Sequence, residues 1–291
     1  MKLHDASPLL HRALITGAGG MIGSYVDFGI RTDHTSLDVT DLAAVRATCR
    51  EYMPPVIVHL AAATDLNRCE KDLAYAHMVN AVGTYNMALA AREIGAKLIY
   101  ISTSDIFDGT KESPYTEDDI PNPPNHYAHS KYLGELAVQG LLSDYLILRV
   151  SWVFGGGVRK DQKFVGKIIQ MLDQAEIRAV ADKRGSPTYG KDVVEGIKRL
   201  LGEGARGIFH MSNAGTPTRA DIAREIIAIT GAATNVVEIN SDSFPMSYST
   251  GANEGMVSKS PFMRPWQEAL REYLETEWTE SLQDTRNNEN V

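Results

Sequence analysis

Two side chains that could move a proton, Tyr127 and Lys131, lie four residues apart in a segment with helical spacing. Residues at this separation share one face of a helix. A free tyrosine has a pKa of about 10, and a fixed cation beside it would lower that pKa, so the hydroxyl could act as a general acid or base. Thr103, at the end of an apolar run, could polarise a carbonyl group or simply form a turn. Because the chain has 12 tyrosines, the pair needs support from its context.

A glycine-rich segment near the start of the chain could bind a pyrophosphate. It reads Thr16-Gly-Ala-Gly-Gly-Met-Ile-Gly23 and lies between an apolar run and a helical start. Gly17, Gly20 and Gly23 would allow a tight turn, a close approach of the backbone to the anion, and close packing of helix on sheet. Unpaired N–H groups at the start of the helix would face the anion. This context favours dinucleotide binding over a structural turn.

An acid that binds the adenosine ribose is expected about 20 residues after the first glycine. Asp33 lies only sixteen residues after Gly17, which predicts a truncated first helix. Asp33 could bind the ribose and favour NADH, or it could be a plain surface acid. Its neighbours Arg31 and His34 could instead accept the 2′-phosphate of NADPH. The sequence therefore predicts NADPH or NADH without choosing between them.

Alternating strands and helices must position these residues. Short apolar runs at 13–16, 56–60, 97–102 and 145–150 alternate with helical patterns at 41–52, 73–94 and 127–142. Strands that are apolar throughout are typical of a parallel sheet covered on both faces. We therefore expect the α/β fold class, with a Rossmann-type doubly wound parallel sheet.

The pattern changes after Trp152. Helices are predicted at 164–172, 191–201, 218–230 (after a Thr218/Asp221 capping box) and 265–276, with a loop at 240–259 and a frayed tail at 284–291. A strand at 207–211 could rejoin the sheet. These patterns predict a dinucleotide-binding domain at 1–150, rejoined by about 189–214. A smaller C-terminal α/β substrate-binding lobe would comprise 151–188 and 215–291.

Composition excludes several classes of protein. With 43% hydrophobic and 23% charged residues, the chain resembles an ordinary globular protein, and its net charge of −8 argues against binding nucleic acid or an anionic membrane. Cys49 and Cys69 have no metal-ligand or disulfide spacing, so no metal site is expected. No signal peptide or membrane span is recognisable, which predicts a cytoplasmic protein. A homodimer is compatible with the sequence, which does not fix the oligomeric state.

Five features occur in one order along the chain: the glycine-rich segment, His59-Leu-Ala-Ala-Ala63, Asn80, Ile101-Ser-Thr103 and Tyr127-x-x-x-Lys131. Their order and spacing resemble the extended short-chain dehydrogenase/reductase superfamily. Flanking segments are similar to the dTDP-4-dehydrorhamnose reductases of that superfamily, from about Ala13 to Tyr273. These segments are Leu37-Asp-Val-Thr-Asp41, Ser102-Thr-Ser-Asp-Ile-Phe-Asp-Gly109, Arg149-Val-Ser-Trp-Val153 and Gly185-Ser-Pro-Thr188.

The resemblance implies a role for individual residues. Thr103, Tyr127 and Lys131 match the catalytic residues of the family, with Thr103 and Tyr127 also touching the substrate and Lys131 also holding the nicotinamide ribose. Trp152 matches an aromatic side chain that packs on the substrate sugar; the alternative is a core tryptophan. The residues that match cofactor contacts are Gly17, Gly20, Met21, Ile22, Gly23, Asp38, Val39, Ala61, Ala62, Thr64 and Asn80.

The implied reaction is the NAD(P)H-dependent reduction of the C4 ketone of a nucleotide-linked 4-keto-6-deoxy sugar, such as dTDP-4-dehydrorhamnose. Tyr127 would protonate the ketone oxygen, and Lys131 and Thr103 would stabilise the developing charge. Two alternatives stay open. A nucleotide-sugar 4-epimerase shares the Tyr/Lys pair, and the regulatory β subunit of methionine adenosyltransferase is a non-catalytic relative that keeps much of the cofactor site.

Three departures from the family concern the site. The acid that follows Thr103 is shifted by one place, to Asp105. A 4,6-dehydratase requires a pair of carboxylates here, and this chain has only one. Thr250-Gly251 stands where the family has an Arg-Pro that contacts the nucleotide, although Asn253 remains. The first helix is also short. The identity of the nucleotide is therefore open, and its phosphates would be met by the glycine-rich backbone and by local cations such as Lys183 and Arg184.

Overall fold

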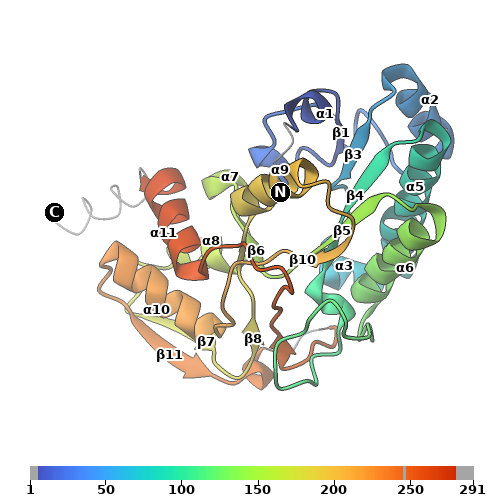
Figure 1. Ribbon diagram of the computed structural model, residues 1–291. Helices are drawn as coiled ribbons and strands as arrows, with labels where there is room; N and C mark the ends of the chain where they lie inside the picture. Colours follow the sequence, from blue (N-terminus) through green and yellow to red (C-terminus); the bar gives the residue numbers. More distant parts are fainter. Residues whose placement is uncertain (1–5, 245–246, 280–291) are drawn as a thin grey trace.

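Parallel strands form a central sheet in the computed structural model, which describes residues 6–244 and 247–279. In this part of the chain the sheet has six strands in the order β10-β5-β4-β3-β1-β2 (Figure 1). Their bounds are β1 (Leu14–Thr16), β2 (Ile30–Arg31), β3 (Val56–His59), β4 (Lys97–Thr103), β5 (Tyr145–Val150) and β10 (Gly207–His210). The direction of winding reverses between β1 and β3, and such a point opens a ligand-binding crevice at the carboxyl ends of the strands. The predicted doubly wound sheet is confirmed.

Helices cover both faces of this sheet. On one face lie α2 (Leu42–Tyr52), α5 (Gly83–Ile94) and α6 (His126–Leu141), and on the other α9 (Gly190–Gly202) with the short α1 (Ser7–His11) and η1 (Ile22–Tyr25) (Figure 1). Successive strand residues alternate between the two faces, so Leu98 and Tyr100 pack on one side and Ile99 on the other. None of the helices within 6–244 and 247–279 is long and apolar enough to cross a membrane.

Capping residues explain where the helices begin and end. Asp41 and Asn125 accept hydrogen bonds from backbone N–H groups in the first turns of α2 and α6. The predicted Thr218/Asp221 capping box is present, at the start of α10 (Arg219–Thr230). Gly95 ends α5 with φ of 71°. These local signals account for the accuracy of the predicted helices at 41–52 and 218–230.

The segment predicted as one helix at 73–94 is interrupted. It comprises α4 (Leu73–His77), a π-helical turn η2 (Met78–Val82) and α5, and it is preceded by an unpredicted helix α3 (Leu66–Lys71). π-helical turns are rare and occur inside otherwise α-helical segments, so the periodicity of 73–94 predicts a continuous helix. The predicted truncation of the first helix is confirmed, because only the four-residue η1 follows the glycine-rich segment.

A second lobe has its own core, at the lower left of Figure 1. It contains α8 (Phe164–Ile169), α11 (Trp266–Glu277), α10 and an unpredicted parallel pair, β7 (Glu176–Val180) with β11 (Asn235–Ile239). β11 is mostly exposed, so its residues lack the apolar pattern of a buried strand. Shorter elements are η3 (Ser104–Ile106), β6 (Val153–Phe154), α7 (Gly157–Lys160), β8 (Arg184–Gly185), β9 (Thr188–Tyr189), η4 (Ser241–Ser243) and β12 (Asn253–Glu254).

The course of the chain supports the division expected from the sequence. β10 pairs with β5 in the central sheet, and α9 packs against that sheet. We therefore propose the same two units, a cofactor domain at 1–150 with 189–214 and a substrate lobe built from 151–188 and 215–291. The predicted frayed tail at 284–291 lies outside the described residues.

A carboxylate near the end of α11 joins the two units. Glu277 Oε1 accepts hydrogen bonds from the hydroxyls of Tyr25 and Tyr189, both at 2.6 Å. Tyr25 closes the turn η1 that follows the glycine-rich segment, and Tyr189 ends β9. One side chain of the second lobe therefore helps to hold the start of the cofactor domain.

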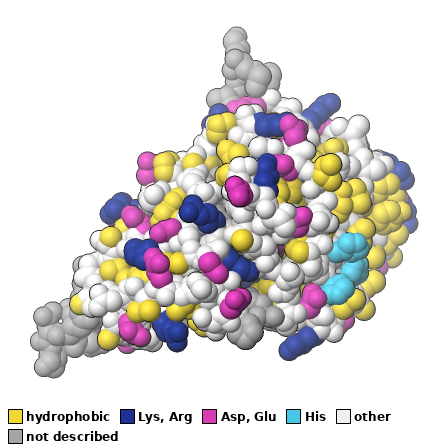
Figure 2. Space-filling view, turned by 90° about the horizontal axis from the view of Figure 1, so that it is seen from below, with side chains coloured by type: hydrophobic (Ala, Val, Ile, Leu, Met, Phe, Trp, Pro, Cys, Tyr) yellow, Lys and Arg dark blue, Asp and Glu magenta, His cyan; other side chains and the backbone are white. Residues whose placement is uncertain are grey.

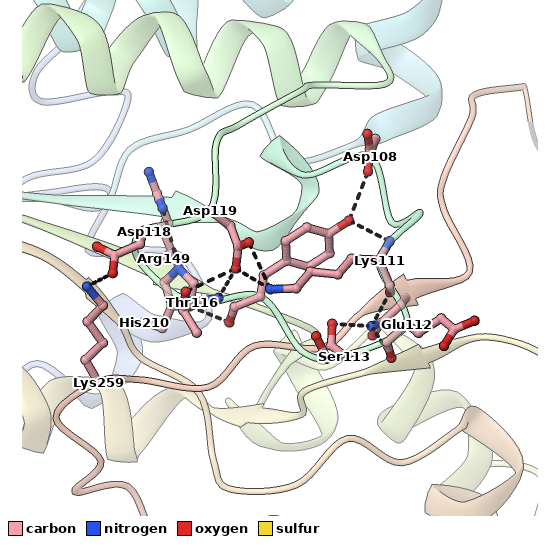
Figure 3. A network of polar contacts seen from close by, with 12 residues as sticks. Asp108, Lys111, Glu112, Ser113, Thr116, Asp118, Asp119, Arg149, His210 and Lys259 are labelled. Carbon is pink, nitrogen blue, oxygen red and sulfur yellow. Dashed lines mark hydrogen bonds and ion pairs between the residues drawn. The ribbon is translucent and has the colours of Figure 1, made fainter.

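A buried ion pair fixes α6 against β5. Arg149 Nε lies 2.9 Å from Glu135 Oε1 and Arg149 Nη2 lies 2.7 Å from Glu135 Oε2, with side chains only 3% and 0% exposed. His210 of β10 lies beside Arg149, as Figure 3 shows, with its Nδ1 3.1 Å from the carbonyl oxygen of Tyr115. The pair sets the position of α6, which carries Tyr127 and Lys131.

Removing Glu135 would leave the charge of Arg149 buried without a partner. We expect Glu135→Ala to lower the free energy of unfolding by about 3–5 kcal/mol, measured by urea denaturation at neutral pH. The control Glu203→Ala removes the partner of Arg199, whose side chain is half exposed. It should lower the free energy of unfolding by at most about 1 kcal/mol. Equal losses in the two variants would contradict a special role for the buried pair.

Candidate active site

The glycine-rich segment forms a tight turn at the carboxyl end of β1. Gly17 has φ of +70°, and a Cβ atom on it would lie 2.5 Å from the backbone nitrogen of Ala61. A Cβ atom on Gly23 would lie 2.6 Å from the Cα atom of Ala18. Gly20, whose N–H donates to Gly17 O, leads through Met21 and Ile22 into η1. No side chain fits at Gly17 or Gly23, and the resulting cradle matches the shape that a dinucleotide pyrophosphate requires.

Charged side chains of both signs border this turn. The Cβ atom of Asp33 lies 3.8 Å from the position that a Cβ atom on Gly19 would take. Hydrogen bonds from Thr35 and Ser36 lower the pKa of Asp33 to about 2, so it is ionised at neutral pH. Arg31 Nη2 donates to Gly23 O at 3.3 Å, and Lys160 Nζ of α7 donates to Gly19 O at 3.0 Å. The rim therefore offers an acceptor for ribose hydroxyls and two cations for a 2′-phosphate.

The predicted cofactor contacts Asp38 and Val39 lie in a segment that is held beside α5. Asp38 Oδ1 accepts hydrogen bonds from the backbone and side chain of Thr40, both at 2.8 Å. Val39 is buried, its Cγ2 atom lies 2.7 Å from the position a Cβ atom on Gly83 would take, and its carbonyl accepts from Asn86. Asp38 stays exposed. The segment thus has a fixed backbone and an exposed carboxylate that Thr40 holds in place.

The segment 61–64 follows β3 and forms one wall of the predicted cofactor site. Asn80, in the π turn η2, holds this wall in place. Asn80 Oδ1 accepts from the N–H of Ala63 at 2.8 Å, and its Nδ2 donates to Ala63 O at 3.0 Å and to Ser130 Oγ at 2.9 Å. Its buried amide therefore joins the wall to α6. Ala61 and Ala62 are partly exposed on this wall and Thr64 is exposed. That Asn80 itself touches the cofactor stays a prediction.

Thr103 and Tyr127 come together at the carboxyl edge of the sheet. Thr103 ends β4, Tyr127 lies in the first turn of α6, and the hydroxyl of Thr103 is among the groups close enough to the Tyr127 phenol to influence its pKa. Both side chains are buried. Burial and the nearby carboxylate of Asp105 raise the pKa of Tyr127, so the phenol is protonated at neutral pH. The pair can donate a proton and a hydrogen bond to one ligand oxygen.

Lys131 lies one helical turn further along α6 but faces the sheet. Its Nζ donates to Ile101 O at 2.7 Å and lies 4.2 Å from the centroid of the Tyr100 ring. Burial lowers the pKa of Lys131 to about 7. The expectation that Lys131 lowers the pKa of Tyr127 is wrong for this arrangement, because the ammonium is directed at Ile101 and burial of the phenol dominates.

His59 connects the glycine turn to this cluster. Its Nδ1 lies 2.7 Å from Thr16 Oγ1 and its Nε2 3.1 Å from Thr84 Oγ1, while its ring stacks on Tyr100 with centroids 5.8 Å apart. Burial and the charge of Lys131 lower the pKa of His59 to about 3, so the ring is neutral. In the sequence His59 is only part of a family motif, and no spacing indicates these contacts.

Trp152 lies at the opposite side of the site, in the second lobe. It has φ of +39°, and its Nε1 donates to Glu254 of β12. The guanidinium of Arg219 lies over its ring.

Burial and the charge of Glu254 raise the pKa of Asp105, whose N–H donates to Thr103 Oγ1 at 3.2 Å. Nothing in the sequence pattern points to Glu254 or Arg219, because each lies more than 60 residues from Trp152.

Of the two cations predicted to meet the phosphates, Lys183 has another partner and Arg184 is exposed. Lys183 Nζ donates to Thr250 O at 3.1 Å and to its hydroxyl. Arg184 lies exposed in β8. Asn253 Nδ2 donates to three carbonyl oxygens of the loop that Figure 3 shows, those of Lys111, Glu112 and Ser113. Asn253 therefore fixes a loop. Within 6–244 and 247–279, no group of three or more His, Cys, Asp or Glu side chains could hold a metal ion.

Most of the chain is similar to known proteins. Residues 11–279 match the family model described as the RmlD substrate binding domain. The chain is 32% identical to the spore coat polysaccharide biosynthesis protein SpsK of Bacillus subtilis, over 91% of this chain and 97% of that protein. It is 34% identical to a dTDP-4-dehydrorhamnose reductase of Mycolicibacterium smegmatis, over 91% and 85%. The crystal structure of a dTDP-4-dehydrorhamnose reductase from Bacillus anthracis in complex with NADP matches with a TM-score of 0.85 and 31% identity, over 90% and 98%.

The lowered pKa of Lys131 predicts a pH-dependent stability. The pKa of Lys131 is about 7 in the folded chain and 10.5 in the unfolded chain. The buried charge therefore lowers the free energy of unfolding by its full amount below pH 7, and this penalty disappears as the pH rises to about 10.5. Lys131→Met should therefore raise the free energy of unfolding most at pH 6, and the gain should shrink by at most about 1.4 kcal/mol per pH unit above pH 7.

Urea denaturation of both proteins between pH 6 and pH 10 measures this difference. The control Lys71→Met removes an exposed lysine of α3 and should show no such trend. A gain that is the same at every pH would show that Lys131 titrates normally.

Proposed function

The chain belongs to the RmlD substrate binding domain family, and we propose that it reduces the C4 ketone of a nucleotide-linked 4-keto-6-deoxy sugar with NADPH or NADH. The expected substrate is dTDP-4-dehydrorhamnose and the product dTDP-L-rhamnose. The observation that carries the proposal is the buried pair of Thr103, at the end of β4, and Tyr127, in the first turn of α6, at the carboxyl edge of the sheet that also bears the glycine cradle. The activities named for the relatives from Mycolicibacterium smegmatis and Bacillus anthracis support the choice of substrate.

Each residue of the pair has a defined part in this reaction. The nicotinamide cofactor, when bound, supplies the hydride. Tyr127 is protonated at neutral pH and donates its proton to the ketone oxygen, while the hydroxyl of Thr103 hydrogen-bonds the same oxygen. Lys131, one helical turn from Tyr127 and held at Ile101 O, is the residue that would hold the nicotinamide ribose of the bound cofactor.

The residues at the glycine turn support both forms of the cofactor. Ionised Asp33 suits the free ribose hydroxyls of NADH, and Arg31 and Lys160 suit the 2′-phosphate of NADPH. NADP is the cofactor in the Bacillus anthracis structure. We therefore keep both as cofactors of the proposed reaction.

We also propose the cytoplasm as the place of this reaction. Cys49 and Cys69 are both buried thiols outside any disulfide, and burial raises the pKa of each. Neutral buried thiols persist in a reducing compartment, which is where disulfide-free enzymes are common.

Replacing Tyr127 tests the proposed reaction directly. With dTDP-4-dehydrorhamnose, the purified chain should consume NADPH or NADH, seen as loss of absorbance of the reduced cofactor. Tyr127→Phe should lower kcat by about 10²–10⁴-fold, because it removes only the proton donor, with the affinity for the cofactor unchanged. Tyr85→Phe, at an exposed tyrosine of α5, is the control and should behave like the wild type.

Three results would contradict the proposal. Equal rates for the wild type and Tyr127→Phe would show that the phenol is not the acid. Sugar epimerisation without net consumption of cofactor would identify an epimerase. Cofactor binding without any turnover would favour a non-catalytic regulatory subunit.

One face of the molecule suggests a second copy of the chain as a partner. Exposed apolar side chains lie close together in sequence and structure on α4, η2, α5 and α6, and Figure 2 shows hydrophobic side chains around exposed histidines on one side. They are Leu73, Met78, Val82, Tyr85 and Leu136, each at least 37% exposed. We propose that this face pairs two chains, because exposed apolar side chains gathered on one face are typical of a contact between proteins.

Light scattering coupled to gel filtration tests this pairing. The wild type should have twice the mass of one chain, and the double variant Met78→Glu/Leu136→Glu should be a monomer. Val257→Glu changes an equally exposed apolar residue elsewhere and should leave the mass unchanged. A monomeric wild type at micromolar concentration would refute the pairing.

A further inference from the structure

Arg219, the first residue of α10, is stacked on two aromatic rings at the substrate side of the site. Its guanidinium carbon lies 4.2 Å from the centroid of Trp152 and 4.9 Å from that of Phe164. A guanidinium stacked in this way keeps its N–H groups, which lie in its plane, available to an acceptor.

No acceptor in the protein uses these donors. Throughout 6–244 and 247–279, Arg219 has no hydrogen bond or ion pair, although its side chain is partly buried. Other arginines have carboxylate partners: Arg149 has Glu135, Arg264 has Asp192, and Arg224 has Glu238. Burial lowers the pKa of Arg219, so enclosing its charge without an acceptor is unfavourable. A ligand with strong acceptors would relieve this cost.

Arg219 also lies close to the reacting groups. Glu254, Tyr248 and Asp105 are the groups near enough to influence its pKa. Asp105 is hydrogen-bonded to Thr103, and its charge acts on Tyr127. Asp105 is therefore near both Arg219 and the proton donor, and Arg219 itself is stacked on Trp152.

The aromatic ring beneath Arg219 is held rigidly. Trp152 Nε1 donates to Glu254, and a Cβ atom on Gly185 would lie 2.2 Å from Trp152 Cε2, so the backbone of β8 packs directly on the ring. A fixed ring holds the guanidinium in one place, which is what recognition of a ligand requires.

We propose that Arg219 binds the diphosphate of the sugar nucleotide and gives the site its preference for nucleotide-linked sugars. This inference rests on the proposed function. In a six-membered sugar ring C1 lies opposite C4, so a ketone at Tyr127 places the diphosphate one ring width away, towards the second lobe. The planar fork of a guanidinium fits two phosphate oxygens. Arg219 also offsets the charges of Asp105 and Glu254, which would otherwise repel the diphosphate.

Of the two cations proposed from the sequence to meet the phosphates, Arg184 is exposed in β8 and Lys183 is already engaged. Lys183 is bonded to Thr250, and Thr250-Gly251 holds no cation of its own. Arg219 thus supplies, from α10, a positive charge that the segment at 250–251 lacks.

Binding of dTDP and of inorganic pyrophosphate to the full chain, measured by calorimetry, tests this role. Arg219→Met should raise the dissociation constant of both by about tenfold to a hundredfold, because one charge-assisted interaction is lost. The dissociation constant of NADPH should not change. Arg224→Met removes a cation from the same helix, where it pairs with Glu238 and Asp221, and is the matched control.

Kinetics with the sugar nucleotide give a second readout. Arg219→Met should raise KM more than it lowers kcat, because the diphosphate is bound equally in the ground state and the transition state. If Arg219→Met does not fold, Arg219→Gln, which is neutral but polar, must show the same losses.

The inference is overturned if a folded Arg219 variant binds dTDP and pyrophosphate as the wild type does, or if Arg224→Met weakens binding equally. A wild type that binds neither ligand at millimolar concentration overturns it as well. These outcomes are distinct from failure of the proposed function. Binding that depends on Arg219 in a chain without reductase activity would support this inference alone, and reductase activity with an unchanged KM in Arg219→Met would support the reductase alone.

Discussion

The buried ammonium of Lys131 is the charge around which the cofactor side of the molecule is arranged. It is bonded to Ile101 O and lies over Tyr100, whose hydroxyl in turn donates to the Lys131 carbonyl. Tyr100 stacks on His59, and His59 reaches Thr16 at the start of the glycine turn. This series of contacts joins α6 to β4, β3 and β1. A cation that is unfavourable to bury therefore sets the spacing between the proton donor and the cofactor cradle.

Much of this cofactor side is predictable because its signals are local. Glycines after a strand, an acid such as Asp41 before a helix and runs such as 97–103 each act within a few residues, and each predicts the element that the structure has. The pair of Tyr127 and Lys131 is likewise readable from one helical turn. The raised pKa of the Tyr127 phenol cannot be predicted from the sequence, because it results from burial, and burial depends on what packs over α6.

The substrate side is assembled from segments far apart in the chain, and sequence patterns do not predict which of these segments come together. Asp105 follows β4, Trp152 follows β5, Arg219 begins α10 and Glu254 belongs to the two-residue strand β12. The last of these lies in a segment predicted to be loop. No periodicity connects such positions, and only the packing of the second lobe brings their charges together. The same holds for Asn80, whose π turn has no hydrophobic signature.

The bonds of Glu277 to Tyr25 and Tyr189 have a consequence for how the protein is made. Tyr25 immediately follows the glycine turn, and its partner is 252 residues further along the chain. A ribosome that has synthesised β1 to β5 has therefore produced a nucleotide cradle without its closing contact. Helix α11 must first emerge, so the contact that closes the turn forms only after the 252 residues that separate Tyr25 from Glu277 have been translated.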